Sequence, residues 1–427
     1  MFRDWSAAYR LFSEPRFDVG RIFDVIGRAC LKQAQPEEPF VVAMDDSLLR
    51  KSGKKTPGVS WRRDPLGPPF QVNFVRAQRV LQISGGVPLG EAPGPVRMIP
   101  LDFCHAPTAT KPRKNAPESE WAAYRRAQKY LNINRQGAER LRVLRERLKK
   151  DDPKRDLWAV VDGRFTNGTF LKNLPERTVA IGRVRSDARF HLPPSSASDG
   201  KRGRKLRYGD LAPTPEALRQ DETVPWQRVR VYAADKIHEV RVKTIGPILW
   251  RAAGADRPLR LIVIAPLAYR PRKGSRLFYR DPAYLICTDP DAPLEKILQA
   301  YVARWDIEVN FRDEKQIIGV GQAQVRSAHS VQSAPALAVA AYALLHLAGL
   351  RAFGKTERPG QVPLPKWRRN APQPRATTSD WIRQLRHELW SAGLNAGNFS
   401  DFSCERRNDP KPEKWLPDLK AAVLYAV

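Results

Sequence analysis

Four side chains that could act on a phosphodiester recur at helical spacing near residue 300: Tyr301, Arg304, Glu308 and Lys315. Because a helix turns by about 100° per residue, all four would project from one stripe roughly 60° wide. The stripe would combine one carboxylate, two cations and a phenol, which suits a metal ion held beside a phosphate backbone. The same spacing also fits an exposed helix with an ordinary i, i+4 Arg–Glu ion pair. We expect a continuous helix over residues 293–315.

Further acids follow two short apolar segments that are typical of buried strands. The first segment ends in Asp45 and Asp46, and the second ends in Asp162. Because adjacent residues of a strand face opposite sides of a sheet, only one of Asp45 and Asp46 can join Asp162, and Asp46 is favoured. Either acid could instead cap a turn. Together with Glu308, three carboxylates would bind Mg²⁺ or Mn²⁺, and two such ions could activate a water or a 3′-hydroxyl.

Composition narrows the class of partner. The chain has 427 residues, of which 42% are hydrophobic, so a globular protein with more than one unit is expected. It carries 74 Lys and Arg against 45 Asp and Glu, a net charge of +29 that is spread along the chain and indicates a polyanionic partner. The four cysteines lack metal-ligand spacing and predict free thiols in a reducing cytosol. The apolar run 334–350 is expected to be a buried helix, so the protein should be cytoplasmic, without membrane insertion.

The order of apolar and polar segments predicts an α/β protein with five regions. These are a short helical N-terminal region (1–38), a first part of the core (39–190), a β-rich insertion with a basic loop (191–287), a second part of the core (288–350) and a basic, proline-rich C-terminal tail (351–427). The loop is expected to contact phosphates without reading sequence, because lysine and arginine contacts to phosphate carry no base information. Its basic residues are Lys201, Arg202, Arg204 and Lys205.

The complete spacing Tyr-x2-Arg-x3-Glu-x6-Lys resembles the hallmark of the DDE transposases of bacterial insertion sequences that carry this motif. Asp46-Ser47 and Asp162-Gly163 are similar to the first two catalytic acids of that group. The resemblance implies a ribonuclease H-like core, a mixed five-stranded sheet flanked by helices, interrupted by the β-rich insertion and extended by helices at both ends. It also implies that Asp46, Asp162 and Glu308 are the catalytic residues and the ligands of two Mg²⁺ or Mn²⁺ ions.

Such an enzyme would cut transposon ends and join the freed 3′-hydroxyls to target DNA, in some relatives through a hairpin intermediate with a flipped base stacked on an aromatic residue. Its partners would be double-stranded DNA, namely terminal inverted repeats and target, and a second copy of the chain in a paired-end complex. Trp305 could be the stacking aromatic or a core residue, and the arginines near 184 could be ordinary surface charge. The positions expected to contact DNA, beside the basic loop, are Tyr301, Arg304, Lys315, Trp305, Arg183 and Arg185.

Two rival functions remain open at this point. One is a ribonuclease H-like nuclease that cuts without joining, which a strand-transfer assay on pre-cleaved ends would distinguish. The other is an inactive, domesticated copy that only binds DNA. The sequence does not reveal which region would recognise the transposon ends, because only about 38 residues precede the first expected strand.

Overall fold

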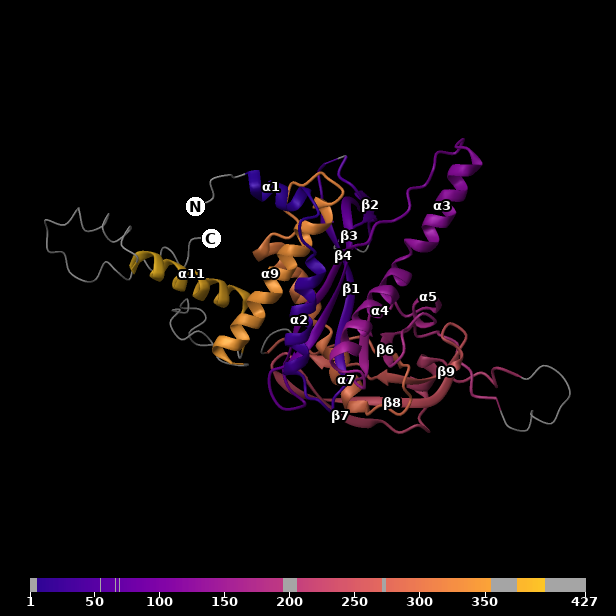
Figure 1. Ribbon diagram of the computed structural model, residues 1–427. Helices are drawn as coiled ribbons and strands as arrows, with labels where there is room; N and C mark the ends of the chain where they lie inside the picture. Colours follow the sequence, from indigo (N-terminus) through magenta and orange to yellow (C-terminus); the bar gives the residue numbers. More distant parts are fainter. Residues whose placement is uncertain are drawn as a thin grey trace. The chain divides into compact units, whose positions relative to one another are not determined.

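The computed structural model describes residues 6–53, 55–65, 67–68, 70–194, 206–270, 274–354 and 375–395 (Figure 1). The chain divides into two compact units, Met1–Ala340 and Ala341–Val427. The basic loop residues Lys201, Arg202, Arg204 and Lys205 lie outside the described residues, as does most of the predicted C-terminal tail.

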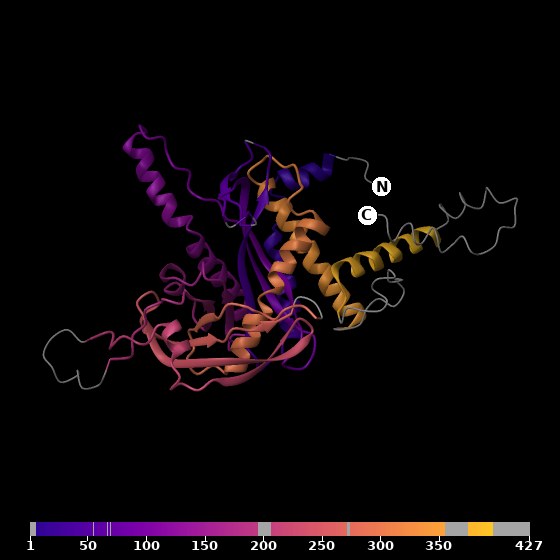
Figure 2. The ribbon, with the colours of Figure 1, turned by 180° about the vertical axis from the view of Figure 1, so that it is seen from behind.

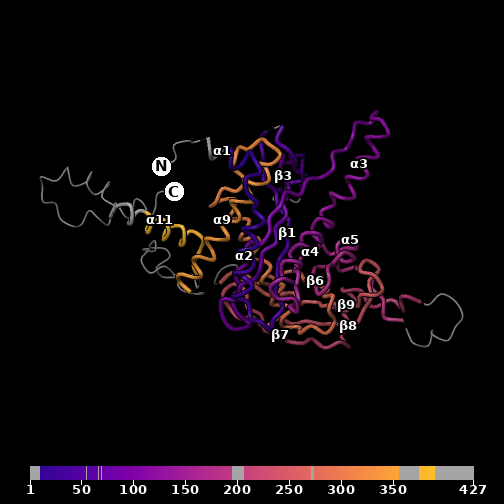
Figure 3. Tube along the Cα trace, in the orientation of Figure 1, coloured from indigo at the N-terminus to yellow at the C-terminus, as the bar shows by residue number. Residues whose placement is uncertain are grey.

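A large mixed sheet with helices on both faces forms the first unit, so the predicted α/β class is confirmed. Within the described residues the sheet has ten strands, in the order β2-β3-β1-β5-β6-β12-β9-β8-β7, with β4 paired to β3. The path of the chain through this unit can be followed in Figure 3. The strands are β1 (Phe40–Arg50), β2 (Ser60–Arg63), β3 (Phe74–Pro88), β4 (Val96–His105), β5 (Leu157–Val161), β6 (Thr178–Arg183), β7 (Gln227–Ala233), β8 (Lys236–Trp250), β9 (Gly254–Ile264) and β12 (Ala283–Cys287). A separate pair is formed by β10 (Ala268–Tyr269) and β11 (Phe278–Tyr279).

The helices that precede residue 320 are mostly short, and the three longest lie in the N-terminal half of the unit. They are α1 (Ser6–Ser13), α2 (Val19–Gln33), α3 (Glu118–Tyr130), α4 (Ile133–Asp151), α5 (Gly168–Leu171), α6 (Pro215–Gln220), α7 (Leu294–Ala303) and α8 (Asp306–Asp313), followed by a π-helix, η2 (Glu314–Ile318). Asn132 separates α3 from α4 because its side chain accepts hydrogen bonds from the backbone N–H groups of Asn134 and Arg135, which caps the second helix. The described cysteines, Cys30, Cys104 and Cys287, are free thiols.

The centre of the sheet is apolar on both faces. All five residues of β5 are buried, which is typical of a strand covered by helices on both sides. On one face, Leu294 and Ile297 of α7 pack in the same cluster as Val160 of β5. On that face too, Ile307 of α8 packs with Ala43 of β1. The crossing of α7 and α8 over the strands can be followed from behind in Figure 2.

The helix expected over residues 293–315 is broken into three segments, so this prediction was wrong in detail. Helix α7 ends at Ala303. The Trp305 N–H donates to Val302 O, three residues earlier, which departs from the α-helical pattern of bonds to the fourth residue back. Helix α8 then starts at Asp306, whose carboxylate accepts the Met98 N–H of β4 at 2.9 Å. The π-helix that follows has a wider turn, which changes the direction in which Lys315 projects. Contacts to β4 therefore override the local helical pattern.

The strands of the predicted β-rich insertion do not form a sheet of their own. Strand β12 pairs antiparallel with β6, and β9, β8 and β7 follow outward from β12. The sheet is therefore larger than the five strands expected from the sequence. Without this region β6 would be an edge strand with unpaired backbone N–H and C=O groups. Strand β12 pairs with those groups.

The apolar helix predicted for residues 334–350 is present, and the boundary between the two units falls within it. Helix α9 (Ser330–Phe353) is, among the described helices, the one that length and composition would allow to cross a membrane. His346 is buried, with its ring 4.3 Å from that of Tyr342 and 4.8 Å from that of Trp381 on α11 (Thr378–Asn395). His346 Nε2 also lies 3.1 Å from Thr378 Oγ1.

Replacing Gly182 of β6 by alanine is expected to lower the free energy of unfolding by about 1–3 kcal/mol through overpacking. A Cβ at Gly182 would lie 2.3 Å from Thr166 Oγ1 and 3.0 Å from Val161 Cγ2. Chemical denaturation measures the change, and Gly27→Ala provides the control, because a Cβ there meets no atom within 4 Å. Equal stability of Gly182→Ala and wild type would contradict the packing described here.

Candidate active site

Asp45 and Asp162 project from the same face of the sheet. Strands β1 and β5 run parallel, with Ala43 paired to Val160. Because side chains alternate along a strand, Asp45 and Asp162 continue the face of that pair. Burial first, and then the charge of Asp162, raise the pKa of Asp45 to about 7. The two carboxylates therefore share one region of negative potential where the parallel pairing of β1 with β5 ends.

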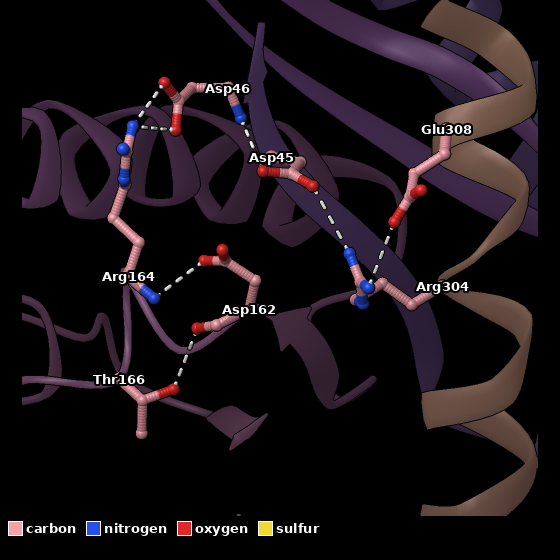
Figure 4. Close-up of polar contacts among 7 residues, drawn as sticks. All are labelled: Asp45, Asp46, Asp162, Arg164, Thr166, Arg304 and Glu308. Carbon is pink, nitrogen blue, oxygen red and sulfur yellow. Dashed lines mark hydrogen bonds and ion pairs between the residues drawn. The ribbon is translucent and has the colours of Figure 1, made fainter. Parts of the chain in front are cut away.

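Arg304 bridges the first of these acids to Glu308. Its Nη1 donates to Asp45 Oδ2 and its Nη2 donates to Glu308 Oε1, each at 3.3 Å (Figure 4). The side chain of Arg304 is only 11% exposed, so this double contact is made largely out of water. Arg304 lies in the turn between α7 and α8, and Glu308 lies in the first turn of α8, where the helix dipole favours a carboxylate. The structure thus places a cation between two of the acids.

Asp46 lies on the opposite side of β1. Both of its carboxylate oxygens accept hydrogen bonds from Arg164 Nη1, at 2.9 and 2.8 Å (Figure 4). Of the two adjacent acids, Asp45 is therefore the one that faces Arg304 and Glu308, whereas the sequence favoured Asp46. The two residues divide between the faces of the sheet, as the alternation of a strand requires.

The loop after β5 is held by its own polar contacts. Asp162 Oδ1 accepts the Arg164 N–H at 2.9 Å, and Asp162 O accepts the Thr166 hydroxyl at 3.0 Å. Phe165 is fully buried and anchors the loop to the core. These contacts hold the carboxylate of Asp162 in one orientation and hold the backbone of Arg164 beside it.

The remaining residues of the four-residue motif approach the same end of β1. Lys315 Nζ donates to Ser47 Oγ at 2.6 Å and lies over the ring of Phe311. Tyr301 is partly buried, and burial raises its pKa while the charges of Asp162 and Glu308 add to the increase. The three-segment path from α7 to η2 therefore still brings Tyr301, Arg304, Glu308 and Lys315 to the neighbourhood of β1.

The other predicted DNA contacts differ in their surroundings. Trp305 is 64% exposed, so it is not a core aromatic. Arg183 is exposed at the end of β6, and its charge acts on Tyr301. Arg185 forms an exposed ion pair with Asp187, 2.9 Å from Nε to Oδ1. Trp305 and Arg183 thus lie in or beside the motif and are available to a ligand.

The acids have the chemistry of a metal site but not its closed geometry. Asp45, Asp162 and Glu308 offer oxygen donors only, which suits a hard divalent cation. Within the described part of the chain, however, no group of three or more His, Cys, Asp or Glu side chains is arranged to hold a metal ion. The guanidinium of Arg304 lies between Asp45 and Glu308 and supplies the positive charge that pairs with both carboxylates.

Sequence reasoning missed a buried polar network beside the motif. Gln82 Nε2 donates to Glu314 Oε1 at 2.9 Å and to Ser84 Oγ at 3.2 Å, and Asn310 Nδ2 donates to Ser84 Oγ and to Met98 O. The network fastens α8 and the π-helix to β3 and β4. The available signal was the polar alternation of Gln82 and Ser84 in the apolar second half of β3.

Comparison with known proteins identifies the family of the chain. A search of curated proteins finds no match to the chain. The family described as DDE superfamily endonuclease matches residues 3–251, more than half of the chain, and this segment contains Asp45, Asp46 and Asp162. Members of this transposase-like superfamily act on DNA and generally use divalent metal ions. The chain belongs to the DDE superfamily endonucleases.

Proposed function

We propose that the chain is a DNA transposase of the Tyr-Arg-Glu-Lys group, encoded by a bacterial insertion sequence, that cleaves transposon ends and transfers the 3′-hydroxyls into target DNA. The supporting observation is the bridge from Asp45 through Arg304 to Glu308. Arg304 and Glu308 lie beyond the segment that matches the family, yet they meet the acid of β1.

The proposed catalytic core is ribonuclease H-like. It consists of β4-β3-β1-β5-β6, in which β4, β3 and β1 are antiparallel neighbours and β5 and β6 run parallel to β1. The core spans residues 39–190 and 288–350, and the 191–287 region is an insertion that extends its sheet. Asp45 and Asp162 lie where the parallel pairing of β1 with β5 ends, and the carboxyl end of parallel strands is where α/β sheets commonly place their reactive groups.

In the proposed mechanism, Asp162 and Glu308 would hold the divalent ions together with Asp45, and Asp46 remains the alternative to Asp45. Two bound Mg²⁺ or Mn²⁺ ions would supply charge stabilisation to the attacking and leaving oxygens of the phosphodiester. Arg304 offsets the negative charge of the acids in the free protein. Once Arg304 releases Asp45, its planar guanidinium is suited to bind a phosphate. Lys315, anchored near Ser47, would hold the flanking backbone.

Trp305→Ala is expected to lower the yield of hairpin or excised product by about 5–100-fold, because stacking on a base contributes about 1–3 kcal/mol. The side chain of Trp305 is exposed beside Arg304, which leaves its face open to a flipped base. Gel analysis of excision on end DNA measures the loss, and Trp305→Phe should restore most of the product. Full excision by the alanine variant would remove Trp305 from the mechanism.

A strand-transfer assay tests the proposed function. The substrate is the DNA flanking the gene, searched for inverted repeats and supplied as pre-cleaved ends together with a supercoiled target plasmid. A transposase gives joined products in Mg²⁺ and none in EDTA, whereas a nuclease of the same fold nicks the plasmid but joins nothing. Light scattering of the protein with end DNA tests the expected homodimer on paired ends.

A further inference from the structure

Three arginines converge on Asp46, on the face of the sheet opposite Asp45. Arg164 Nη1 bonds both oxygens of Asp46. Arg79 of β3 and Arg62 of β2 lie on this same face, because Asp46 pairs with Leu81 and the side chains of β2 and β3 alternate in register with it. The charges of Asp46 and Arg164 act on both Arg62 and Arg79.

This cluster has more positive than negative charge. The cluster contains three guanidinium groups and one carboxylate, that of Asp46, so its net charge is 3 − 1 = +2. Burial lowers the pKa of Arg79 to about 10 and lowers that of Arg62 as well, so both cations are partly removed from water. Holding excess cations in such a place is unfavourable unless an anion compensates them.

The hydrogen bonds of the cluster are also incomplete. Arg62 donates from Nη2 to Thr108 Oγ1 at 3.0 Å, while its Nε is buried and has no hydrogen-bond partner among the described residues. Arg79 donates one hydrogen bond to the described residues, from Nε to Ala106 O at 3.4 Å. Arg164 has a side chain that is 53% exposed, so the cluster is open to solvent on that side. An anion with several oxygen acceptors could reach the cluster from that side.

We propose that Arg62, Arg79 and Arg164 bind one phosphate of the DNA strand, and that Asp46 is the counter-ion that holds Arg164 in place until DNA binds. The proposal rests on the proposed function, which supplies DNA as the substrate. Planar guanidinium forks match the oxygen geometry of a phosphate.

The position of this phosphate site gives it a role in placing the scissile bond. Asp46 directly follows Asp45, and the backbone N–H of Arg164 bonds the carboxylate of Asp162. A phosphate that engages Arg164 therefore lies next to the two segments that carry the proposed catalytic acids, the middle of β1 and the loop after β5. Contacts of this kind fix the register of the backbone and carry no sequence information.

The test measures DNA binding without cleavage, by fluorescence anisotropy of a labelled 30-base-pair duplex of arbitrary sequence in EDTA, over a range of salt concentrations. Arg62→Gln and Arg164→Gln are each expected to weaken binding about tenfold, and the double variant should reduce the slope of log K against log salt by about 1. Asp46→Asn should tighten binding, because Arg164 is then released to the DNA.

Arg63→Gln is the matched control. Arg63 is the neighbour of Arg62 on β2, carries the same charge and is exposed on the other face of the strand. Its substitution should change affinity less than twofold. Equal losses for Arg62→Gln and Arg63→Gln would show that overall surface charge alone matters, and would overturn the proposal.

Arg164 keeps the test decisive if Arg62→Gln fails to fold, because its side chain is half exposed and it lies in the turn after β5. Unchanged DNA binding by Arg164→Gln would overturn the proposed phosphate site, whatever the strand-transfer assay shows. Arginine-dependent binding by a protein that gives no joined product would instead overturn the proposed transposase and leave this site standing.

Discussion

Asp45→Asn is expected to reduce Mg²⁺-dependent DNA cleavage roughly a thousandfold or more, in line with the loss of other catalytic groups. Asp45 faces the side of the sheet that carries Asp162, and its carboxylate contacts Arg304. Asparagine has nearly the same shape but removes the negative charge that a divalent ion needs from its ligand. Single-turnover cleavage of end DNA measures the change.

Asp46→Asn is the informative comparison for this prediction. Asp46 is bound to Arg164 on the opposite face, so its substitution should reduce cleavage less than tenfold while changing the affinity for DNA. Circular dichroism and thermal melting of both variants separate a loss of fold from a loss of chemistry. If Asp46→Asn were the inactive variant and Asp45→Asn cleaved normally, the assignment of the first catalytic acid would have to be exchanged.

The second large effect is on stability and concerns Glu314. This side chain is 2% exposed, and burial raises its pKa to about 8, although the hydrogen bond from Gln82 and the charge of Lys315 oppose the increase. Glu314 is therefore protonated in the folded protein at neutral pH. In the unfolded chain its pKa returns to an ordinary value of about 4.3.

The sign of the pH dependence follows from the proton count. Between these two pKa values the folded state binds one proton more than the unfolded state, so the free energy of unfolding falls as pH rises, by about 1.4 kcal/mol per pH unit. The contribution of the protonated Glu314 is fully present below the unfolded pKa and is lost as pH rises through about 8. Wild-type protein should therefore lose several kcal/mol between pH 5 and pH 8 from this group alone, on the order of 4 kcal/mol.

Glu314→Gln isolates that contribution. Glutamine stays neutral at all pH values, can accept the hydrogen bond from Gln82 Nε2 and can donate to Gln82 Oε1, which is buried without a partner among the described residues. Chemical denaturation at pH 5, 6, 7 and 8 should give a flatter profile than wild type, with the variant more stable at pH 8. The exposed Glu91→Gln is the control and should keep the wild-type slope. Parallel profiles for Glu314→Gln and wild type would exclude a neutral, buried Glu314.

Glu314 also shows why part of the site escaped prediction. In the sequence it is one of several charged residues in a helical pattern, with no local sign that it is buried. Its environment is created by Gln82 and Ser84, which lie more than 200 positions away. The break between α7 and α8 has a similar origin, because Asp306 is fixed by a backbone N–H of β4.

Local patterns were sufficient wherever the cause was local. The apolar run before Asp162 forms the buried strand β5, Asn132 separates two helices by capping the second, and the apolar run near residue 340 forms a helix with buried residues. The four-residue motif near residue 300 was also apparent from spacing alone, and its members do approach β1. These features depend on side-chain period and capping within about one turn or one strand.

The choice between Asp45 and Asp46 needed the tertiary structure. Strand β1 is apolar on both faces, since Ala43 and Met44 are both fully buried, so hydrophobic alternation could not show which face meets α7 and α8. That face is decided by the parallel register of β1 on β5 and by the helices that pack over it. The sequence alone determined which acids follow the apolar segments and which cations follow a helical spacing. The expectation that the first strand ends at Asp45 and Asp46 was wrong, because β1 continues to Arg50 in its pairing with β3. Long-range strand pairing and packing decided which of those acids Arg304 contacts, because a one-residue difference in a strand reverses the direction of a side chain.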